Sequence, residues 1–356
     1  MSGILRSGNL VRPLCLMASL FVSVPASAAP ASPEDAAPRP LPFTGVNLAG
    51  GEFGAPKAGV AQVYGKNFVY PSTSEFDYFA SHGVNVIRLP IHWEVLQPEM
   101  NKPLDPVELS RLQAVVKDAL KHRLVIILDP HNYARYYDKI VGTPDVPAAA
   151  FADFWSRLSA TFQDDPRVWF GLMNEPHDMP ASQWLGDANA AIAAIRKTGA
   201  KNLILVPGVR WTGAGSWLDG DADANGAVML GVKDPKNHYV YEVHQYLDVD
   251  GSGTHKEVVS PTIGVERLQK FTEWCRQHHQ RAFLGEVAVA ASPEGEAAIE
   301  NMLTDMEKNR DVWVGYSWWA AGPWWGDYMF TLEPKDGVDR PQMGYLKAHL
   351  QGPPAL

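Results

Sequence analysis

The sequence predicts a (β/α)8 barrel, and three observations lead to this fold class. Short apolar runs alternate with amphipathic stretches over most of the chain. Nearly all of these runs are continuously apolar, as expected for parallel strands that are buried on both faces. Eight of them recur at intervals of roughly forty residues, about one strand-plus-helix unit each. An open doubly wound sheet is the alternative, but Gly50-Gly51-Glu52-Phe53-Gly54 lacks the spacing of the phosphate loop that such a sheet would need.

The predicted strands are short, and a polar or aromatic residue stands at or just beyond the end of each. In chain order they are Gly45–Leu48, Val84–Leu89, Leu124–Leu128, Val168–Met173, Leu203–Val206, Tyr239–Val243, Ala282–Leu284 and Val312–Trp318. The residues at their ends are Asn47, Arg88, His131, Asn174, Trp211, His244, Glu286 and Trp319. Because the carboxyl ends of barrel strands carry the chemistry of this fold, we expect these side chains to gather at one mouth.

The clearest predicted helix is Pro106–Arg123. Its apolar residues recur at helical spacing and form one stripe: Leu109, Leu112, Val115, Val116, Ala119 and Leu120. Asp105 stands at the expected N-cap, Pro106 at the first helical position, and Glu108 where a capping box would place it.

The first residues have the pattern of a targeting segment. Arg6 and Arg12 supply a positive region, Leu14 to Val24 an apolar one, and Ala26-Ser27-Ala28 a cleavage pattern. We therefore expect a signal peptide over residues 1–28, a Pro/Ala-rich leader over 29–41 and one catalytic barrel over 42–356. The apolar stretch is too short for a stop-transfer helix, so the mature chain is expected to be secreted or periplasmic, without a membrane anchor.

Composition excludes some classes of partner. The chain has 356 residues and a formal net charge of −9, with no Lys/Arg-rich stripe, which disfavours nucleic acid. Cys275 is the only cysteine after the targeting segment, so no internal disulfide is expected. Asp248-Val249-Asp250-Gly251-Ser252-Gly253 begins like a calcium loop but has Val259 where the bidentate Glu should stand. We expect a monomer with no metal and no cofactor.

Two glutamates end apolar runs in the same way. Glu175 closes the run that begins at Val168, and Glu286 closes the run that begins at Arg281. Two carboxylates that face each other are the minimal apparatus for cleaving a glycosidic bond. The alternative is that each glutamate is a strand-end charge in an ion pair. Because both glutamates stand at the end of an apolar run, the catalytic interpretation is favoured over two unrelated ion pairs.

Other strand-end residues suit the same chemistry. Arg88 is a fixed positive charge that would keep a neighbouring carboxylate ionised. The alternative is that Arg88 forms a structural ion pair across the barrel mouth. His131 and His244 occupy equivalent positions, which favours substrate contact over the usual role of a lone buried histidine. Tyr246 lies two residues after His244 and therefore on the same strand face.

Aromatic residues are concentrated near the C-terminus. The segment from Tyr316 to Tyr328 holds Trp318, Trp319, Trp324 and Trp325, with Gly and Pro between them. A core role would explain one or two of them, whereas four in a loop-like segment indicate stacking faces for sugar rings. Trp211, with Trp217, could form another such face.

These residues resemble glycoside hydrolase family 5. The resemblance rests on Asn174-Glu175-Pro176, Gly285-Glu286, His244-x-Tyr246 and Trp319. The segments 45–54, 246–255 and 319–328 make it similar to the endo-β-1,4-glucanase, or cellulase, branch, and the likeness covers nearly the whole mature chain.

The resemblance implies a role for each matching residue. Glu175 would be the general acid/base and Glu286 the nucleophile of a retaining double displacement. Substrate contacts would come from Arg88, His92, His131, Asn132, Asn174, Trp211, His244, Tyr246, Trp319 and Trp324. Within this set, Asn174 would bind the sugar 2-hydroxyl, Arg88 and Tyr246 would support Glu286, and Trp319 would lie under the reacting sugar.

The implied substrate is a β-1,4-glucan, and three alternatives stay open. A β-mannanase or a broader β-glucanase would use the same reacting pair with different platforms. A sugar-binding barrel that has lost catalysis belongs to another class of protein. A transglycosylase would pass the same covalent intermediate to a sugar instead of water.

Overall fold

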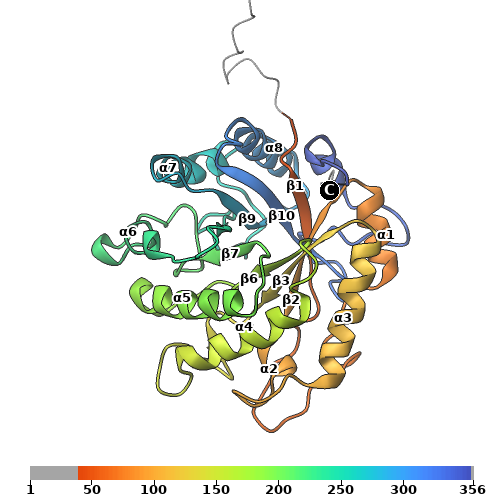
Figure 1. Ribbon diagram of the computed structural model, residues 1–356. Helices are drawn as coiled ribbons and strands as arrows, with labels where there is room; N and C mark the ends of the chain where they lie inside the picture. The colour runs from red at the N-terminus through yellow and green to blue at the C-terminus, as the bar shows by residue number, and fades with distance from the viewer. Residues whose placement is uncertain (1–38, 354–356) are drawn as a thin grey trace, which may run out of the picture. The chain divides into compact units, whose positions relative to one another are not determined.

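The computed structural model describes residues 39–353, which form a closed barrel of eight parallel strands (Figure 1). Around the barrel the order is β1-β10-β9-β8-β7-β6-β3-β2. The strands are β1 (Phe43–Leu48), β2 (Val86–Ile91), β3 (Val125–Pro130), β6 (Val168–Gly171), β7 (Ile204–Pro207), β8 (Tyr239–His244), β9 (Ala282–Val287) and β10 (Trp313–Ala321). The predicted (β/α)8 barrel is confirmed, and each observed strand overlaps its predicted range.

The expected signal peptide and most of the expected leader lie outside the described residues. The predicted barrel domain, residues 42–356, begins one residue before β1 at Phe43. No helix within residues 39–353 combines the length and apolar character needed to cross a bilayer.

Helices surround the barrel (Figure 1). They are α1 (Thr73–Ser81), α2 (Trp93–Leu96), α3 (Pro106–Lys121), α4 (Ala148–Phe162), α5 (Ala181–Lys197), α6 (Asn225–Val228), α7 (Ile263–Gln277), α8 (Pro293–Lys308) and α9 (Pro341–Leu346). Between β7 and β8 the full helix of the repeating pattern is replaced by the four-residue α6 and two 3₁₀ turns. A short hairpin of β4 (Arg135–Tyr136) and β5 (Lys139–Ile140), which the sequence did not predict, follows β3.

The start of α3 is the part of the sequence prediction that the structure tests most closely. Asp105 caps the helix, because its Oδ1 accepts hydrogen bonds from the backbone N–H groups of Val107 and Glu108, both at 2.9 Å. The reciprocal half of the capping box is absent. The Glu108 side chain accepts from Arg111 instead, and the Asp105 N–H donates to the Leu96 carbonyl.

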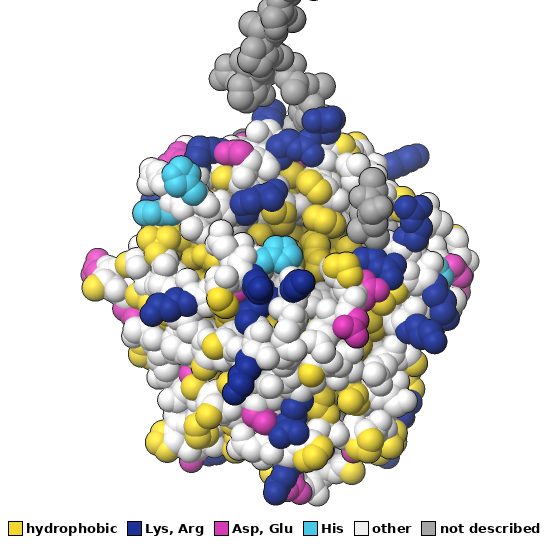
Figure 2. Space-filling view, in the orientation of Figure 1, with side chains coloured by type: hydrophobic (Ala, Val, Ile, Leu, Met, Phe, Trp, Pro, Cys, Tyr) yellow, Lys and Arg dark blue, Asp and Glu magenta, His cyan; other side chains and the backbone are white. Residues whose placement is uncertain are grey.

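Basic residues stand before several strands, at the end where the strands begin. Arg123, Lys201 and Arg281 are exposed and precede β3, β7 and β9, and half-buried Arg167 precedes β6. Figures 1 and 2 view the barrel from this end, and Lys and Arg side chains gather near the middle of the face. The strand-end glutamates are therefore at the opposite end of the barrel.

Asp187 is a buried carboxylate on α5 with an orphaned oxygen. The residue is 2% exposed, and its Oδ2 has no hydrogen-bond partner. Burial raises the pKa of the carboxyl group to about 7, because the charged form is poorly solvated. Since the folded state then holds a proton that the unfolded chain releases at lower pH, the contribution of Asp187 to stability decreases as pH rises from about 4 to about 7.

We predict that Asp105→Ala lowers the free energy of unfolding by about 1 kcal/mol, because two N–H groups of α3 lose their acceptor. Chemical denaturation followed by circular dichroism measures the change. Asp105→Asn retains a capping oxygen and is the matched control, so a loss of the same size in both variants would contradict the capping role.

We predict that Asp187→Asn raises the melting temperature above pH 7 and leaves it unchanged near pH 4. The amide imitates the protonated acid, so it removes only the cost of holding the charged form in the core. Thermal melts across this pH range test the prediction, with Asp145→Asn at an exposed position as control. A difference that is independent of pH would exclude the titration of Asp187 as its cause.

Candidate active site

Arg88 lies at the centre of the candidate site. It stands on β2, is fully buried, and forms three ion pairs. Its Nε lies 2.8 Å from Glu242 Oε1, and its Nη1 lies 3.0 Å from Asp129 Oδ2 and 3.2 Å from Glu286 Oε1. Burial acts to lower the pKa of Arg88, but these carboxylates outweigh it and raise the pKa above its ordinary value. Arg88 is therefore a permanent cation that neutralises charge drawn from three other strands.

Two asparagines complete the shell around the guanidinium. Arg88 donates from Nη1 to Asn47 Oδ1 at 3.0 Å and from Nη2 to Asn174 Oδ1 at 2.9 Å. The Asn47 amide in turn donates to the backbone carbonyls of Gly285 and Trp318. The planar side chain is thus held from several directions, and Asn174 is oriented by the same cation.

Glu286 on β9 is buried, and both of its oxygens accept hydrogen bonds. Arg88 donates to Oε1, and the Tyr246 hydroxyl donates to Oε2 at 2.6 Å. Burial raises the pKa of Glu286, and the charge of Glu175 adds to this, while His244, Arg88 and His131 act in the opposite sense. Two donors aimed at two oxygens form the environment of an ionised carboxylate.

Glu175 lies beside His244 at the mouth of the barrel. His244 Nδ1 is 2.7 Å from Glu175 Oε1 and 3.6 Å from Glu286 Oε2. One carboxylate oxygen from each glutamate and a ring nitrogen of His244 all lie within 4.8 Å of one another. Burial acts to lower the pKa of His244, but Glu286, Glu175 and Glu242 outweigh it and raise the pKa to about 10. His244 is therefore cationic between the two acids.

His131 is held in a second hydrogen-bonded row. Its Nδ1 lies 2.8 Å from Asp129 Oδ2, and its Nε2 lies 3.1 Å from the Asn174 amide nitrogen. Burial acts to lower the pKa of His131, but Asp129 outweighs it and raises the pKa. The ring stacks on Trp319 with centroids 5.1 Å apart and planes at 19°.

Asp129 and Glu242 were missing from the residues expected at the site. Both are at most 1% exposed, and each pairs with Arg88. A signal for Glu242 was available, because it stands two residues before His244 and four before Tyr246 and so shares their strand face. Asp129 ends the apolar run of β3 two residues before His131, which is the same period.

Gly285 leaves space for this network. A Cβ at this position would lie 2.3 Å from Glu242 Oε1 and 2.8 Å from His244 Nε2. Both distances are too short for non-bonded atoms, so any side chain would displace Glu242 or His244. The residue before Glu286 must therefore be glycine for the charged groups to pack as they do.

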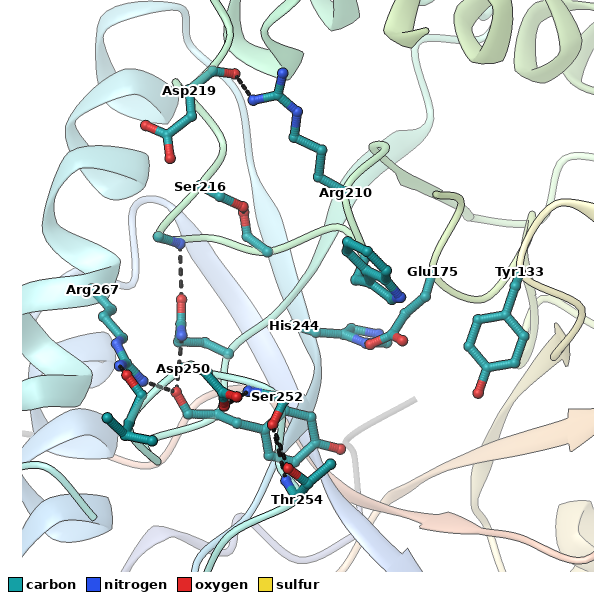
Figure 3. A pocket seen from close by; sticks show the side chains of 17 residues that line it. Tyr133, Glu175, Arg210, Ser216, Asp219, His244, Asp250, Ser252, Thr254 and Arg267 are labelled. Atoms are coloured by element: carbon teal, nitrogen blue, oxygen red, sulfur yellow. Dashed lines mark hydrogen bonds and ion pairs between the residues drawn. The ribbon is translucent and has the colours of Figure 1, made fainter. Parts of the chain in front are cut away.

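A cleft of about 800 Å³ opens beside Glu175 (Figure 3). Of the predicted residues, Glu175, Trp211, His244 and Tyr246 line it. Tyr133, which the sequence analysis missed, faces Glu175 across it and is 37% exposed. Trp211 is 51% exposed and rests on His177, with ring centroids 4.7 Å apart and planes at 11°. Trp211 therefore presents a flat face at the cleft.

The four tryptophans near the C-terminus divide between core and surface. Trp318 is fully buried, Trp319 and Trp325 are partly exposed, and Trp324 is 42% exposed. The suggestion that Trp217 supplies a stacking face is wrong. Trp217 is fully buried and packs edge-on against aromatic residues of the core.

The structure does not bring His92 and Asn132 to the cleft of Figure 3. The Asn132 amide is engaged inside the fold, where its Oδ1 accepts from the Trp93 N–H at 2.9 Å and its Nδ2 donates to Glu94 at 2.5 Å. His92 Nδ1 lies 3.7 Å from Glu94. Burial lowers the pKa of His92 to about 4, so the imidazole is neutral.

Two clusters within the described residues have the spacing of metal ligands, and in each the side chains already bond to neighbouring protein groups. Glu175, His244 and Glu286 form the first, where His244 Nδ1 lies 2.7 Å from Glu175 Oε1 while Arg88 and Tyr246 donate to the two oxygens of Glu286. Asp248, Asp250 and His255 form the second. There the Asp248 carboxylate accepts from the backbone N–H groups of residues 253, 254 and 255, so it folds its own loop.

Known proteins are similar to this chain in sequence and fold. A family model described as cellulase (glycosyl hydrolase family 5) matches residues 40–322. Endo-beta-1,4-glucanase B of Emericella nidulans is 38% identical over 321 residues, which cover 90% of this chain and 94% of that protein.

Two solved structures carry bound sugars. XacCel5A in complex with cellopentaose is 50% identical, with a TM-score of 0.84, and the match covers 87% of this chain and 99% of that one. Pseudomonas stutzeri endoglucanase Cel5A in complex with cellobiose is 34% identical, with a TM-score of 0.81, covering 89% and 95%. The family match spans well over half of this chain, and this chain belongs to glycosyl hydrolase family 5.

Proposed function

We propose that this protein is a retaining endo-β-1,4-glucanase, which hydrolyses internal β-1,4-glucosidic bonds of cellulose or related β-glucans. The proposal rests on one observation above all, which is that carboxylate oxygens of Glu175 and Glu286 lie within 4.8 Å of each other. Retaining glycosidases hold their carboxyl groups about 5–5.5 Å apart, whereas inverting enzymes leave about 6.5–9.5 Å for a water molecule. The short separation favours direct attack by one carboxylate on the anomeric carbon.

In this proposal Glu286 is the nucleophile. Arg88 and Tyr246 donate to its two oxygens, which supports the ionised form that attack requires. As the glycosyl-enzyme bond forms, the negative charge on Glu286 is consumed, while Arg88 keeps Asp129 and Glu242 neutralised. Asn174, held by Arg88, is oriented for the 2-hydroxyl of the same sugar.

Glu175 is the proposed acid/base, and His244 is its proton partner. The raised pKa of His244, about 10, means that the pair retains a proton throughout the neutral range. In the first step Glu175 takes the shared proton from His244 Nδ1 and passes it to the leaving oxygen, which leaves His244 neutral. In the second step Glu175 takes a proton from the water that releases the glycosyl-enzyme and returns it to His244. The cleft beside Glu175 gives that water a route to the site.

Aromatic faces on two sides of the reacting pair support internal cleavage. Trp211 follows β7, whereas Trp319 and Trp324 belong to β10 and the loop after it, with β8 and β9 between them in the barrel. A glucan lying across both sides would be cut within the chain. The cellopentaose and cellobiose held by the two solved relatives are β-1,4-linked glucose, which supports this substrate class.

The alternatives share the reacting pair and differ in measurable ways. Release of reducing ends from carboxymethylcellulose, mannan and mixed-linkage glucan, measured side by side, separates a glucanase from a mannanase or a broader enzyme. No release from any of them would establish a sugar-binding barrel without catalysis. Products longer than the substrate at high acceptor concentration would identify a transglycosylase.

We also propose that residues 1–28 direct export and are removed near Ala28, leaving an unanchored monomer. N-terminal sequencing of the exported protein tests the cleavage position, and light scattering tests the oligomeric state. A mature chain that still begins at Met1 would exclude the signal peptide.

We predict that Glu286→Gln lowers kcat at least about 1,000-fold, because the amide cannot form the glycosyl-enzyme bond. Binding of cello-oligosaccharides should persist, as measured by calorimetry, since Gln has nearly the same shape. Glu257→Gln at an exposed position is the control. Turnover close to that of the wild type would overturn the assignment of the nucleophile.

We predict that Glu175→Ala reduces activity on cellulose far more than on 2,4-dinitrophenyl β-cellobioside. The dinitrophenolate group leaves without protonation, so a missing acid matters little to the first step. Steady-state rates on the two substrates give the comparison. Equal losses on both would remove Glu175 from the role of general acid.

A further inference from the structure

We propose that Arg340 is a positioning residue for substrate binding, because it holds the loop that presents Trp324 beside the site. The inference rests on the proposed function. Trp324 lies in the segment 322–340, which follows β10 and leads to α9. Arg340 is the N-cap residue of α9, so it stands at the far end of this segment from the tryptophans.

A row of aromatic rings leads from Trp319, which stacks on His131, to Trp324. Trp319 meets Trp325 edge-on at 5.9 Å between centroids, and Trp325 meets Phe53 edge-on at 5.3 Å. Phe53 in turn lies 6.3 Å from Trp324. The last ring is the most exposed of the row, at 42%. Trp324 is followed directly by Trp325 and Gly326, so the backbone of this turn sets where its ring lies.

That backbone is fixed by the Arg340 guanidinium. Nη2 donates to the Gly326 carbonyl at 2.8 Å, immediately after Trp325. Nη1 pairs with Asp327 Oδ1 at 3.2 Å, and Nε donates to the Glu333 carbonyl at 2.8 Å. One planar group therefore joins the outgoing and returning halves of the loop.

The two ends of this clamp are anchored in the fold. On the α9 side, Met343 and Leu346 are buried, and Gln342 donates to the Met329 carbonyl at 3.0 Å. At the start of the loop, the Gly322 N–H donates to the Glu333 carboxylate at 3.0 Å. Between these anchors, the turn at Gly326 has positive φ, and Lys335 pairs with Asp327 on the exposed side. Arg340 is thus a link between the aromatic turn and the core, in addition to the Trp325 Nε1–H group, which donates to the Ala321 carbonyl at 3.1 Å.

Lysine cannot replace this arginine fully. A single ammonium can keep the ion pair with Asp327, but it cannot reach two carbonyls and a carboxylate in the directions of the guanidinium fork. The exposed Lys335–Asp327 pair is of the kind that contributes little by itself. Loss of Arg340 should therefore loosen the turn, whereas loss of Lys335 should not.

The test is a double-mutant cycle on hydrolysis of cellohexaose. Arg340→Ala should raise KM about fivefold, with kcat within about twofold of the wild type, because only the approach of distant sugars is affected. Trp324→Ala should raise KM similarly, and adding Arg340→Ala to it should have no further effect. Arg340→Lys should give an intermediate KM, and Lys335→Ala should leave KM nearly unchanged.

Other outcomes overturn the inference. An unchanged KM in Arg340→Ala, or an increase of equal size with and without Trp324, would show that Arg340 does not act through that ring. If Arg340→Ala fails to fold, Arg340→Lys carries the same cycle. Calorimetric binding of cellohexaose to the same variants separates the two proposals. If the wild type binds the sugar without hydrolysing it, the proposed function is contradicted, and the affinities of the variants still test the role of Arg340. If the wild type does not bind the sugar, both proposals are contradicted.

Discussion

The charge of Arg88 is the constraint on which the site depends. Three carboxylates from β3, β8 and β9 converge on one buried guanidinium, and two asparagines complete its shell. Removing one partner from a buried network of this kind typically costs about 3–5 kcal/mol, because the remaining charges lose their compensation. The same contacts orient Glu286 and Asn174, so the network that lets the charges be buried also arranges the groups proposed to act on the sugar.

The closed barrel makes this convergence possible. Parallel strands all end at one mouth, and alternate residues on a strand point to the same side. On β8 and just beyond it, Glu242, His244 and Tyr246 follow this period and reach Arg88, Glu175 and Glu286 respectively. One strand therefore contacts the central cation, the proposed acid and the proposed nucleophile. Residues far apart in sequence meet because the strands carrying them are neighbours in the ring.

Much of the fold could be predicted from the sequence, because its signals are local. Eight apolar runs gave the strands, and an N-cap followed by a stripe of apolar residues gave α3. The absence of a full helix between β7 and β8 could not be predicted from pattern alone, since a (β/α)8 repeat implies one there and the chain has the four-residue α6 and two 3₁₀ turns instead. The Glu108 side chain accepts a hydrogen bond from Arg111 and not from the Asp105 N–H group. Residue spacing alone cannot predict which of these two nearby donors it binds.

Position at the end of a strand predicted which residues belong to the site, whereas residue type alone did not. Glu175, Glu286, Arg88, His131, Asn174, His244, Tyr246 and Trp319 lie together as strand-end placement predicts. Asp129 and Glu242 were missed because each stands inside an apolar run, where only the period of two that they share with His131, or with His244 and Tyr246, marks them as site residues. Trp217 and Trp211 show the same limit for aromatic residues: one lies in the core and the other at the cleft, although they are six residues apart.

Gly285 has a consequence for how this site could change over time. The position next to the proposed nucleophile has no room for even a methyl group while Glu242 and His244 occupy their places. A mutation there would be harmful unless a neighbour shrank at once, and both neighbours hold charges that other residues need. Variation among descendants of this protein is therefore expected in the outer loops and their aromatic rings, where substrate preference can shift while the reacting centre stays the same.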